Sequence, residues 1–172
     1  MAGVSANIGQ TLTAKVTGSA TGAATPVAGV SISHALQLEA GTAALGKADL
    51  LYTATRTLAA SATENLDLTG VLVGPVGTAF NAAEVVAIVV EAAAANTNTV
   101  VIGGAASNAF LGPFALATDT LKVKPGQWLF LTDTTGWPVT AGTGDLLKVT
   151  NGAAGTAVTY TITVIARSVV DA

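Results

Sequence analysis

The stretch EVVAIVVEAAAANTNTVVIGG, from Glu84 to Gly104, decides the fold class of this chain. Its apolar run, Val85 to Val90, spans six residues between two glutamates, whereas a helix needs roughly 20 consecutive apolar residues to cross a bilayer core. This run is therefore not a membrane span. Val and Ile are stiff in helices and pack well in sheets, so the run predicts a buried strand. Alanines follow and favour a helix, which makes Ala82 to Ala95 the one segment where a helix competes.

The second half of the stretch predicts a turn and a returning strand. Asn96 to Thr99 supplies residues that tolerate turn geometry and bond their own backbone, and the β-branched run Val100 to Ile102 follows. We therefore interpret Glu84 to Gly104 as a β-hairpin. A second hairpin is predicted near the end of the chain, where the loop NGAAG joins Leu146 to Thr150 with the alternating segment Val158 to Ile165.

Alternation of apolar and polar residues predicts further strands. One strand places Leu50, Tyr52, Ala54 and Leu58 on one face and Thr53, Thr55 and Thr57 on the other. Arg56 lies on the apolar face, where it is expected to cap the core edge or pair with an acid; a binding role is the alternative. Pro125-Gly126 predicts a type II turn. The segment QWLFLTD after it carries apolar residues on both faces, with Trp128 and Phe130 on one and Leu129 and Leu131 on the other. Seven to ten short strands of this kind predict a β-sandwich or jelly roll.

The first part of the chain, residues 1–46, is rich in Gly, Ala, Ser and Thr. Its segment GSATGAATPVAG, residues 18–29, predicts a flexible or extended linker between two short alternating strands. Two interpretations stay open: an extended arm that orders against a neighbouring subunit, or the first pair of strands of the main domain. We assign residues 1–46 to an N-terminal arm and residues 47–172 to the β-sandwich domain.

The composition predicts a protein that assembles. Charged residues make up 10% of the chain, against roughly 25% in typical soluble domains, and 51% of the residues are hydrophobic. A monomer would expose many Ala, Val and Leu side chains that subunit contacts can cover, so we expect a homo-oligomer or a piece of a larger shell. The alternative is that small alanines and threonines make an uncharged surface that a monomer tolerates. Lysines and arginines are scattered, which disfavours nucleic-acid binding. The amino terminus lacks the basic and apolar regions of a signal peptide, so no Sec export is expected.

No catalytic site is legible in the sequence. The one histidine, His34, has no triad pattern around it, and a single His without cysteine cannot build a zinc site. We interpret His34 as a surface or interface residue. Asp119, Asp133 and Asp145 fall in predicted loops, where a calcium site is the alternative to simple turn formation.

Three glutamates, Glu64, Glu84 and Glu91, could supply the carboxylate pair of a glycosidase if the fold gathered them. The chain has eight aromatic residues, however, and so offers few platforms for a sugar cleft. Trp128 and Trp137 are interpreted as core or interface anchors. We therefore predict that the protein is not an enzyme and has no catalytic, cofactor-binding or metal-binding residues.

Two stretches carry a family resemblance. They are DLLYTATRTLAASATENLDLTG, Asp49 to Gly70, and LKVKPGQWLFLTDTTGWPVTAGTGDLLKVTNGAAGTAVTYTITVIARS, Leu121 to Ser168. In the order of their segments and in their residue pattern, they resemble the small capsid decoration (cement) proteins and related virion structural proteins of tailed bacteriophages. The similarity covers roughly residues 47–168 and includes no catalytic motif.

The resemblance implies an all-β, jelly-roll-like β-sandwich with an extended N-terminal arm. Such a protein is made in the host cytoplasm, sits on the capsid surface of the virion, bridges major capsid subunits and keeps the head closed. Its expected partners are the major capsid protein and further copies of itself, with a trimer favoured over a dimer and with no nucleic acid or membrane. Other hypotheses are a carbohydrate-binding or adhesin-type β-sandwich, a tail or head-tail joining component, and a hydrolase that uses the three glutamates.

Overall fold

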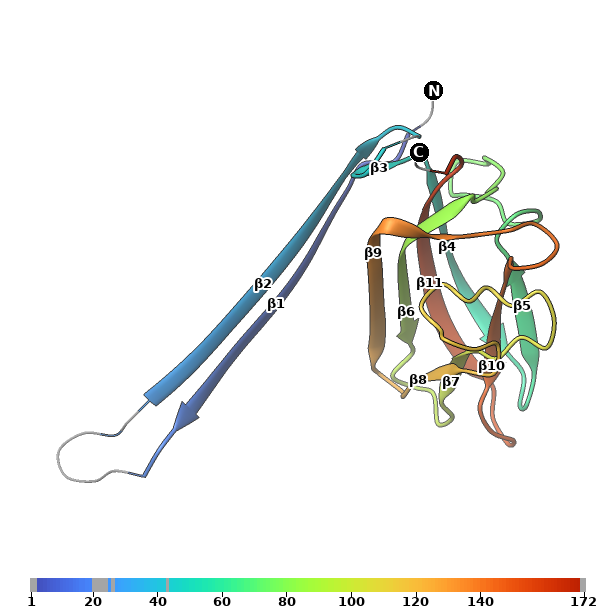
Figure 1. The fold of residues 1–172 in the computed structure, drawn as a ribbon. Helices are drawn as coiled ribbons and strands as arrows, with labels where there is room; N and C mark the ends of the chain where they lie inside the picture. The colour runs from blue at the N-terminus through green and yellow to red at the C-terminus, as the bar shows by residue number, and fades with distance from the viewer. Residues whose placement is uncertain (1–2, 20–24, 26, 43, 171–172) are drawn as a thin grey trace.

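The computed structural model describes residues 3–19, 25, 27–42 and 44–170. Every regular element within these residues is a β-strand, and the strands form three sheets (Figure 1). The prediction of an all-β chain with sandwich-like packing is confirmed. The helix considered for Ala82 to Ala95 does not form, because strand β6 (Glu84–Ala92) occupies that segment. Across the described residues, no helix has the length and apolarity that crossing a membrane requires.

The N-terminal sheet is a long hairpin. Strands β1 (Ala6–Thr17) and β2 (Val27–Ala40) pair antiparallel from Ala6–Leu38 to Thr17–Val27, and the short β3 (Lys47–Ala48) pairs in parallel with the last two residues of β2. The hairpin joins the rest of the molecule at one end and diverges from it toward the tip (Figure 1). The predicted linker, residues 18–29, lies partly outside the described residues.

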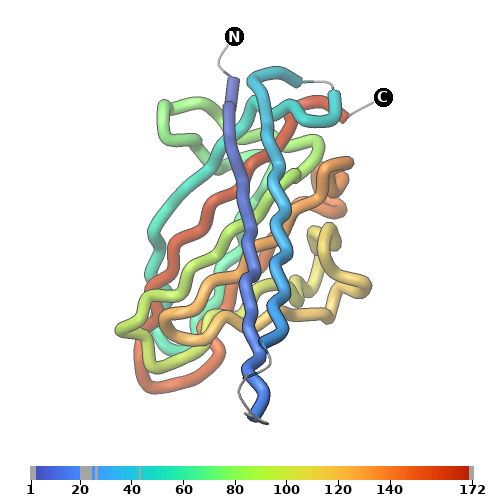
Figure 2. The backbone as a smooth tube through the Cα atoms, turned by 90° about the vertical axis from the view of Figure 1, so that its left-hand side faces the viewer, coloured from blue at the N-terminus to red at the C-terminus, as the bar shows by residue number. Residues whose placement is uncertain are grey.

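Two four-stranded antiparallel sheets pack face to face to form the sandwich. The first, which we call the hairpin-side sheet, has the order β4 (Leu50–Leu58), β11 (Val158–Arg167), β6 and β9 (Trp128–Pro138). The second, the far sheet, has the order β5 (Thr63–Asp67), β10 (Leu146–Asn151), β7 (Val100–Gly103) and β8 (Thr120–Val123). Viewed from the side, the hairpin crosses in front of the hairpin-side sheet (Figure 2).

The core between the sheets follows the predicted alternation. Along β11, Tyr160, Ile162 and Val164 point inward and are at most 1% exposed. They meet the inward residues of the far sheet, among them Leu66, Ile102, Leu147 and Val149. The threonines that alternate with the inward residues of β4 and β11 lie on the opposite face of the hairpin-side sheet, as the sequence predicts.

Both predicted hairpins in the sandwich are wrong. Strands β6 and β7 lie in different sheets, as do β10 and β11, so each connection crosses the sandwich instead of turning back. The asparagines between β6 and β7, which the sequence predicted to form a turn, instead bond residues in and beside the connection between β10 and β11. Asn98 Nδ2 donates to Asn151 Oδ1 at 3.0 Å and to the carbonyl of Thr156 at 3.0 Å. Asn96 exchanges two hydrogen bonds of 2.8 Å with the backbone of Thr159.

The Pro125-Gly126 turn is present as predicted. The amide of Gln127 donates to the carbonyl of Lys124 at 2.9 Å, and Gly126 has φ +71°, the left-handed value that the third residue of a type II turn requires. This turn delivers the chain into β9, the edge strand of the hairpin-side sheet.

A small second core fixes the base of the hairpin to the sandwich. Leu38 and Ala48 are buried against Val86, Ala87 and Ile165 of the hairpin-side sheet. Partly buried residues from the base of the hairpin and from β4 complete this cluster: Val4, Ala6, Ile8, Leu36 and Leu51. The hairpin therefore docks through its base alone, and its direction is set there.

Candidate binding surface

The hairpin presents one apolar face and one polar face. The antiparallel register places the even-numbered residues of β1 and β2 side by side. We call this side the inner face of the hairpin; it consists of Ala6, Ile8, Gln10, Leu12, Ala14, Val16, Ala28, Val30, Ile32, His34, Leu36 and Leu38. It carries no Lys, Arg, Asp or Glu. The opposite face is mostly Thr, Ser, Asn, Gln and Gly.

Half of the inner face is covered and half is open. Near the base, Leu38 is 2% exposed because it packs on the sandwich. Toward the tip, the four large side chains on the same face remain in solvent: Leu12 (55% exposed), Val16 (69%), Val30 (54%) and Ile32 (45%). A continuous row of exposed apolar side chains of this kind is typical of a surface that is covered in an assembly.

The hairpin-side sheet turns a threonine-rich face toward the hairpin. Three cross-strand pairs link β4 to β11 by hydroxyl hydrogen bonds: Thr53 to Thr163 at 2.9 Å, Thr55 to Thr161 at 2.9 Å and Thr57 to Thr159 at 3.1 Å. Val89, Glu91, Trp128 and Phe130 continue this face across β6 and β9. Because the threonine hydroxyls bond one another, this face exposes threonine methyl groups and paired hydroxyls. Its one carboxylate is that of Glu91.

A groove separates the hairpin from this face. It has a volume of about 660 Å³, and its walls come from the middle of the hairpin on one side and from the start of β9 on the other. Leu12, Ile32 and His34 line the hairpin wall, and Trp128 and Phe130 line the β9 wall. Aliphatic side chains of the hairpin and aromatic side chains of β9 therefore stand on opposite walls of the groove, and Gln10 lies on the hairpin wall with them.

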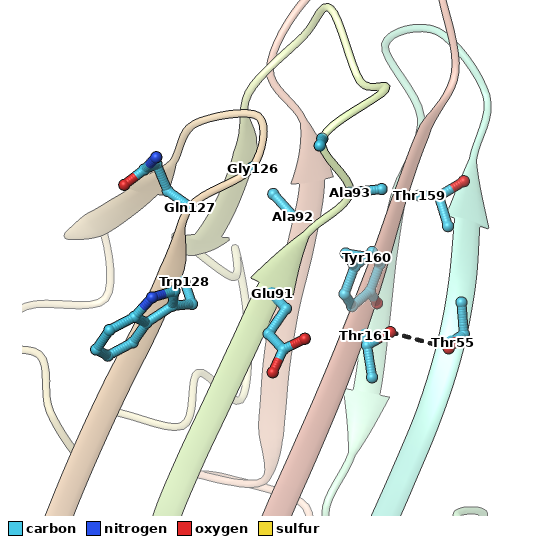
Figure 3. Close-up of a pocket in the computed structure, with 11 residues that line it drawn as sticks. Thr55, Glu91, Ala92, Ala93, Gly126, Gln127, Trp128, Thr159, Tyr160 and Thr161 are labelled. Atoms are coloured by element: carbon cyan, nitrogen blue, oxygen red, sulfur yellow. Dashed lines mark hydrogen bonds between the residues drawn. The ribbon is translucent and has the colours of Figure 1, made fainter. Parts of the chain in front are cut away.

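A second, shallower hollow of about 390 Å³ lies on the same sheet face (Figure 3). Trp128, which is 66% exposed, and Glu91 stand beside each other on neighbouring strands, and Gln127 lies at the edge. The hydrogen-bonded pair Thr55 and Thr161 forms the other side. An exposed indole can stack on the apolar face of a ligand ring, and a carboxylate and an amide beside it can form hydrogen bonds with the hydroxyl groups of that ring.

A buried ion pair holds the base of the hairpin in place. Arg167 at the end of β11 is fully buried, and its Nε donates to Glu84 Oε2 at 2.8 Å. The same guanidinium donates to the carbonyl of Ala44, in the connection from the hairpin, and to the carbonyl of Thr135 in β9. Gly136 has φ +88°, and a Cβ there would lie 2.5 Å from Arg167 Nη2. One side chain thus ties three separate segments together.

A second polar network lies at the inner edge of the sandwich and confirms the expected role of Arg56. Its Nε donates to Glu64 Oε2 at 2.7 Å, and Tyr160 Oη donates to Glu64 Oε1 at 2.6 Å. Burial alone would raise the pKa of Glu64, but hydrogen bonds from Arg56 and Tyr160 and the charge of Arg56 outweigh it. The pKa of Glu64 therefore lies below its usual value. Burial and the bond to Glu64 raise the pKa of Tyr160.

The aspartates that were weighed as a calcium site form local turns. Asp133 accepts hydrogen bonds from the hydroxyl and amide of Thr135, which lower the pKa of its carboxyl although partial burial opposes this. Asp119 accepts from the amide of Leu116, and Asp145 accepts from Gly142 and Thr69. Within the described residues, no three His, Asp or Glu side chains gather in a way that could hold a metal ion.

The three glutamates weighed as a carboxylate pair are engaged in separate places. Glu64 bonds Arg56, Glu84 bonds Arg167, and Glu91 is exposed on the threonine-rich face. Trp137 packs against the main core, whereas Trp128 is a surface residue. His34 lines the groove wall on the hairpin. The fold thus brings Trp128, Glu91 and His34 to one side of the molecule, and it leaves Glu64 partly buried and Glu84 buried elsewhere.

Comparison with protein-family models, curated proteins and solved structures finds no match to this chain. The surface itself is therefore the basis for assigning a role.

Sequence reasoning missed the hairpin wall of the groove. Leu12 and Ile32 belong to strands that the sequence predicts, but nothing in their local pattern distinguishes a strand that packs on a core from one that projects away. One sequence signal could have identified these residues: a long alternation of apolar and polar residues next to a segment with few large and few charged side chains.

Proposed function

We propose that this chain is a non-enzymatic virion structural protein that binds the outer surface of a tailed-bacteriophage capsid, bridges major capsid subunits and stabilises the head. The observation that carries the proposal is the open half of the hairpin's inner face. A soluble chain that worked alone would gain nothing from holding four large aliphatic side chains in water. A chain that works by being docked to a shell needs such a surface.

In this proposal the hairpin is the N-terminal arm that grips a neighbour, and the sandwich is the body that the arm presents. The low charge of the chain supports an assembled setting, because a docked subunit does not have to solvate all of its surface. Several weak contacts per assembly would cement a shell through effective concentration. Each contact needs about 800 Å² from each partner, which is a small part of the 9140 Å² that the chain exposes.

The proposal extends to the topology of the sandwich, which we assign to the jelly-roll class. Eight strands divide into two four-stranded sheets, and all but one of the connections between consecutive strands from β4 to β11 pass from one sheet to the other. This order supports the assignment, since jelly rolls are double sheets of eight antiparallel strands. The class occurs in viral capsid proteins, which is an argument by fold analogy.

The test uses particles. Purified protein is added to phage heads from which surface proteins have been stripped, and to expanded heads, and cryo-EM maps are compared with and without it. We expect added density on the outer surface at positions that bridge capsid subunits. Absence of the protein from native particles, together with no rebinding to either kind of head, would refute the proposal. Density on the tail or at the head-tail joint would instead support the tail or head-tail component.

Trp128 and Glu91 favour one further candidate, a carbohydrate-binding sandwich. The hollow in Figure 3 places an exposed indole next to hydrogen-bonding groups, which suits a sugar ring. A glycan array run with and without calcium tests it, using Trp128→Ala as the binding-site variant and Leu116→Ala, an exposed loop position, as the control. Specific binding that is lost in the Trp128 variant alone would support this candidate, and a flat array would reject it.

A further inference from the structure

The groove between the hairpin and the hairpin-side sheet has the composition of an unfilled interface. Leu12 and Ile32 of the inner face line one wall, beside Gln10 and His34, and the start of β9, with Trp128 and Phe130, lines the other. The base of the same inner face already packs on the same sheet through Leu38, Val86 and Ile165. The two walls are therefore compatible surfaces that are held apart by the divergence of the hairpin (Figure 1).

We propose that the hairpin of a second copy of this chain fills this groove, and that two copies exchange hairpins about a two-fold axis. In this pair each hairpin lies between the partner's hairpin and the partner's hairpin-side sheet. The two inner faces then meet each other at the axis, and the polar outer face of each hairpin lies on the threonine-rich face of the other copy.

The chemistry of each layer matches in this arrangement. The inner face carries no Lys, Arg, Asp or Glu, so two inner faces meet mainly through aliphatic side chains, with Gln10 and His34 at the end nearest the base. The outer face of the hairpin presents Thr11, Thr13, Ser31 and Ser33, whose hydroxyls suit the threonine pairs of β4 and β11, and it carries one charged residue in this stretch, Lys15. A two-fold contact requires a self-complementary patch, and an apolar face without charge is such a patch.

The area is sufficient for a stable pair. The open part of the hairpin runs from the pair Gln10–His34 to the pair Val16–Ala28. At roughly 3.4 Å per residue and two strands about 4.8 Å apart, each of its faces measures about 24 Å by 10 Å. The exchange covers six faces of this size: the two inner faces, the two outer faces and the sheet face under each outer face. Together they bury about 1,400 Å², which is within the range of about 1,200 to 2,000 Å² for specific interfaces.

The inference does not rest on the proposed function. It concerns the free chain in solution, so a chain that pairs but fails to bind phage heads would leave the exchange standing and remove the virion role. A chain that binds heads but stays monomeric would do the reverse. The two-fold pair also differs from the trimer that the family resemblance favours, and mass alone separates them.

Mass measurement of the full chain by light scattering and sedimentation is the first test. We expect a concentration-dependent species of twice the 16.8 kDa chain mass. Leu12→Lys and Ile32→Lys, which bury a charge between the inner faces, should weaken pairing about tenfold or more. Leu116→Lys changes an equally exposed leucine on a loop of the sandwich and should leave it unchanged. A monomer at about 100 μM, where interfaces of this size are formed, would overturn the proposal, as would a trimer or a pair insensitive to both lysines.

Disulfide formation is the second test and fixes the layer order. The chain has no cysteine, so single-cysteine variants start from a clean background. On oxidation, cysteines on the inner face, at Leu12, Ala14, Val30 and Ile32, should include variants that link two copies to each other. Cysteine at Thr13, on the outer face, should not link to itself but should link to a second variant with cysteine at Thr161. Self-linking at Thr13 without any at the inner face would overturn the arrangement.

Discussion

The hairpin and the sandwich are built from the same kind of strand but are stabilised in opposite ways. In the sandwich, the inward side chains of β11 are buried against a second sheet, and each strand of the hairpin-side sheet is held through its neighbours. Beyond its base, the hairpin has backbone pairing and little else, and a two-stranded hairpin alone is marginally stable in water. The comparison teaches that alternation makes a strand, while a facing surface makes it stable.

Amide hydrogen exchange should show the largest contrast between the two regions. In dilute solution, amides of Leu12 and Ile32 should exchange through local opening that costs little free energy. Amides of Ile162 and Val164 should exchange only through global unfolding, which costs about 5 to 15 kcal/mol in typical domains. Mass spectrometry of fragments measures both. Equal protection of the hairpin and β11 in dilute solution would contradict the predicted difference. If protection of the hairpin instead rises with protein concentration, that protection comes from assembly.

Loss of Arg167 should be the most damaging single change at the junction of the two regions. Arg167→Met leaves Glu84 buried without its partner, so we expect the free energy of unfolding to fall by about 3 to 5 kcal/mol. Urea titration followed by tryptophan fluorescence measures the loss. Lys122→Met, at an exposed position on β8, is the matched control and should stay within about 0.5 kcal/mol. A small loss at Arg167 would mean that the junction does not depend on this ion pair.

Two isoleucines compare the regions with the same substitution. Ile162→Ala removes a side chain that is 0% exposed in the core and should cost about 2 to 5 kcal/mol. Ile32→Ala removes one that is 45% exposed on the hairpin and should cost less than about 0.5 kcal/mol in the free chain. Thermal unfolding of dilute samples measures both. Similar losses at the two positions would show that the hairpin's inner face is covered in the free chain.

The smallest expected effect is the acid sensitivity of the Arg56–Glu64 network. The folded state holds the pKa of Glu64 below its unfolded value of about 4.5, so the ionised carboxylate stabilises the fold at higher pH. This contribution is lost as the pH falls through the lowered folded pKa. Stability measured by urea titration from pH 6 down to pH 3 should therefore decline less steeply in Glu64→Gln.

Glu39 supplies the control for this pH dependence. Its pKa is lowered mainly by the hydrogen bond from Lys47, with the charge of Lys47 adding to this, but the pair is exposed at the base of the hairpin. Solvent screens such pairs, so Glu39→Gln should leave the acid decline nearly unchanged. A change at Glu39 that equals the change at Glu64 would indicate that unfolding begins at the hairpin base.

The strands were predictable from the sequence because strand formation is read locally. The alternation of Tyr52 with Thr53, and of Ile162 with Thr163, gives the inward and outward faces without knowledge of any partner. Pairing was not predictable in the same way. Four or five residues with Asn and Gly can reverse a chain within a sheet or carry it across a sandwich, and Asn98 reaches Asn151, 53 positions away. Long-range bonds of this kind leave no local pattern.

The candidate surface was predictable in part. Trp128 and Phe130 were placed on one face of β9, and that face does line the groove. What could not be predicted is the open side of the hairpin, since Leu12 and Ile32 have the pattern of core residues. Burial depends on where the rest of the chain lies, and here the hairpin diverges from the sheet beyond its docked base (Figure 1).

The docked base and open tip make the hairpin a mechanical lever. Twelve residue pairs at roughly 3.4 Å each give it a length of about 41 Å, so a tilt of about 10° at the base would carry the tip about 7 Å. Leu38, Ala48 and the few side chains around them act as the pivot. A small change of angle at this base would therefore displace the exposed side chains near the tip much farther than Leu38, while the sandwich keeps its shape.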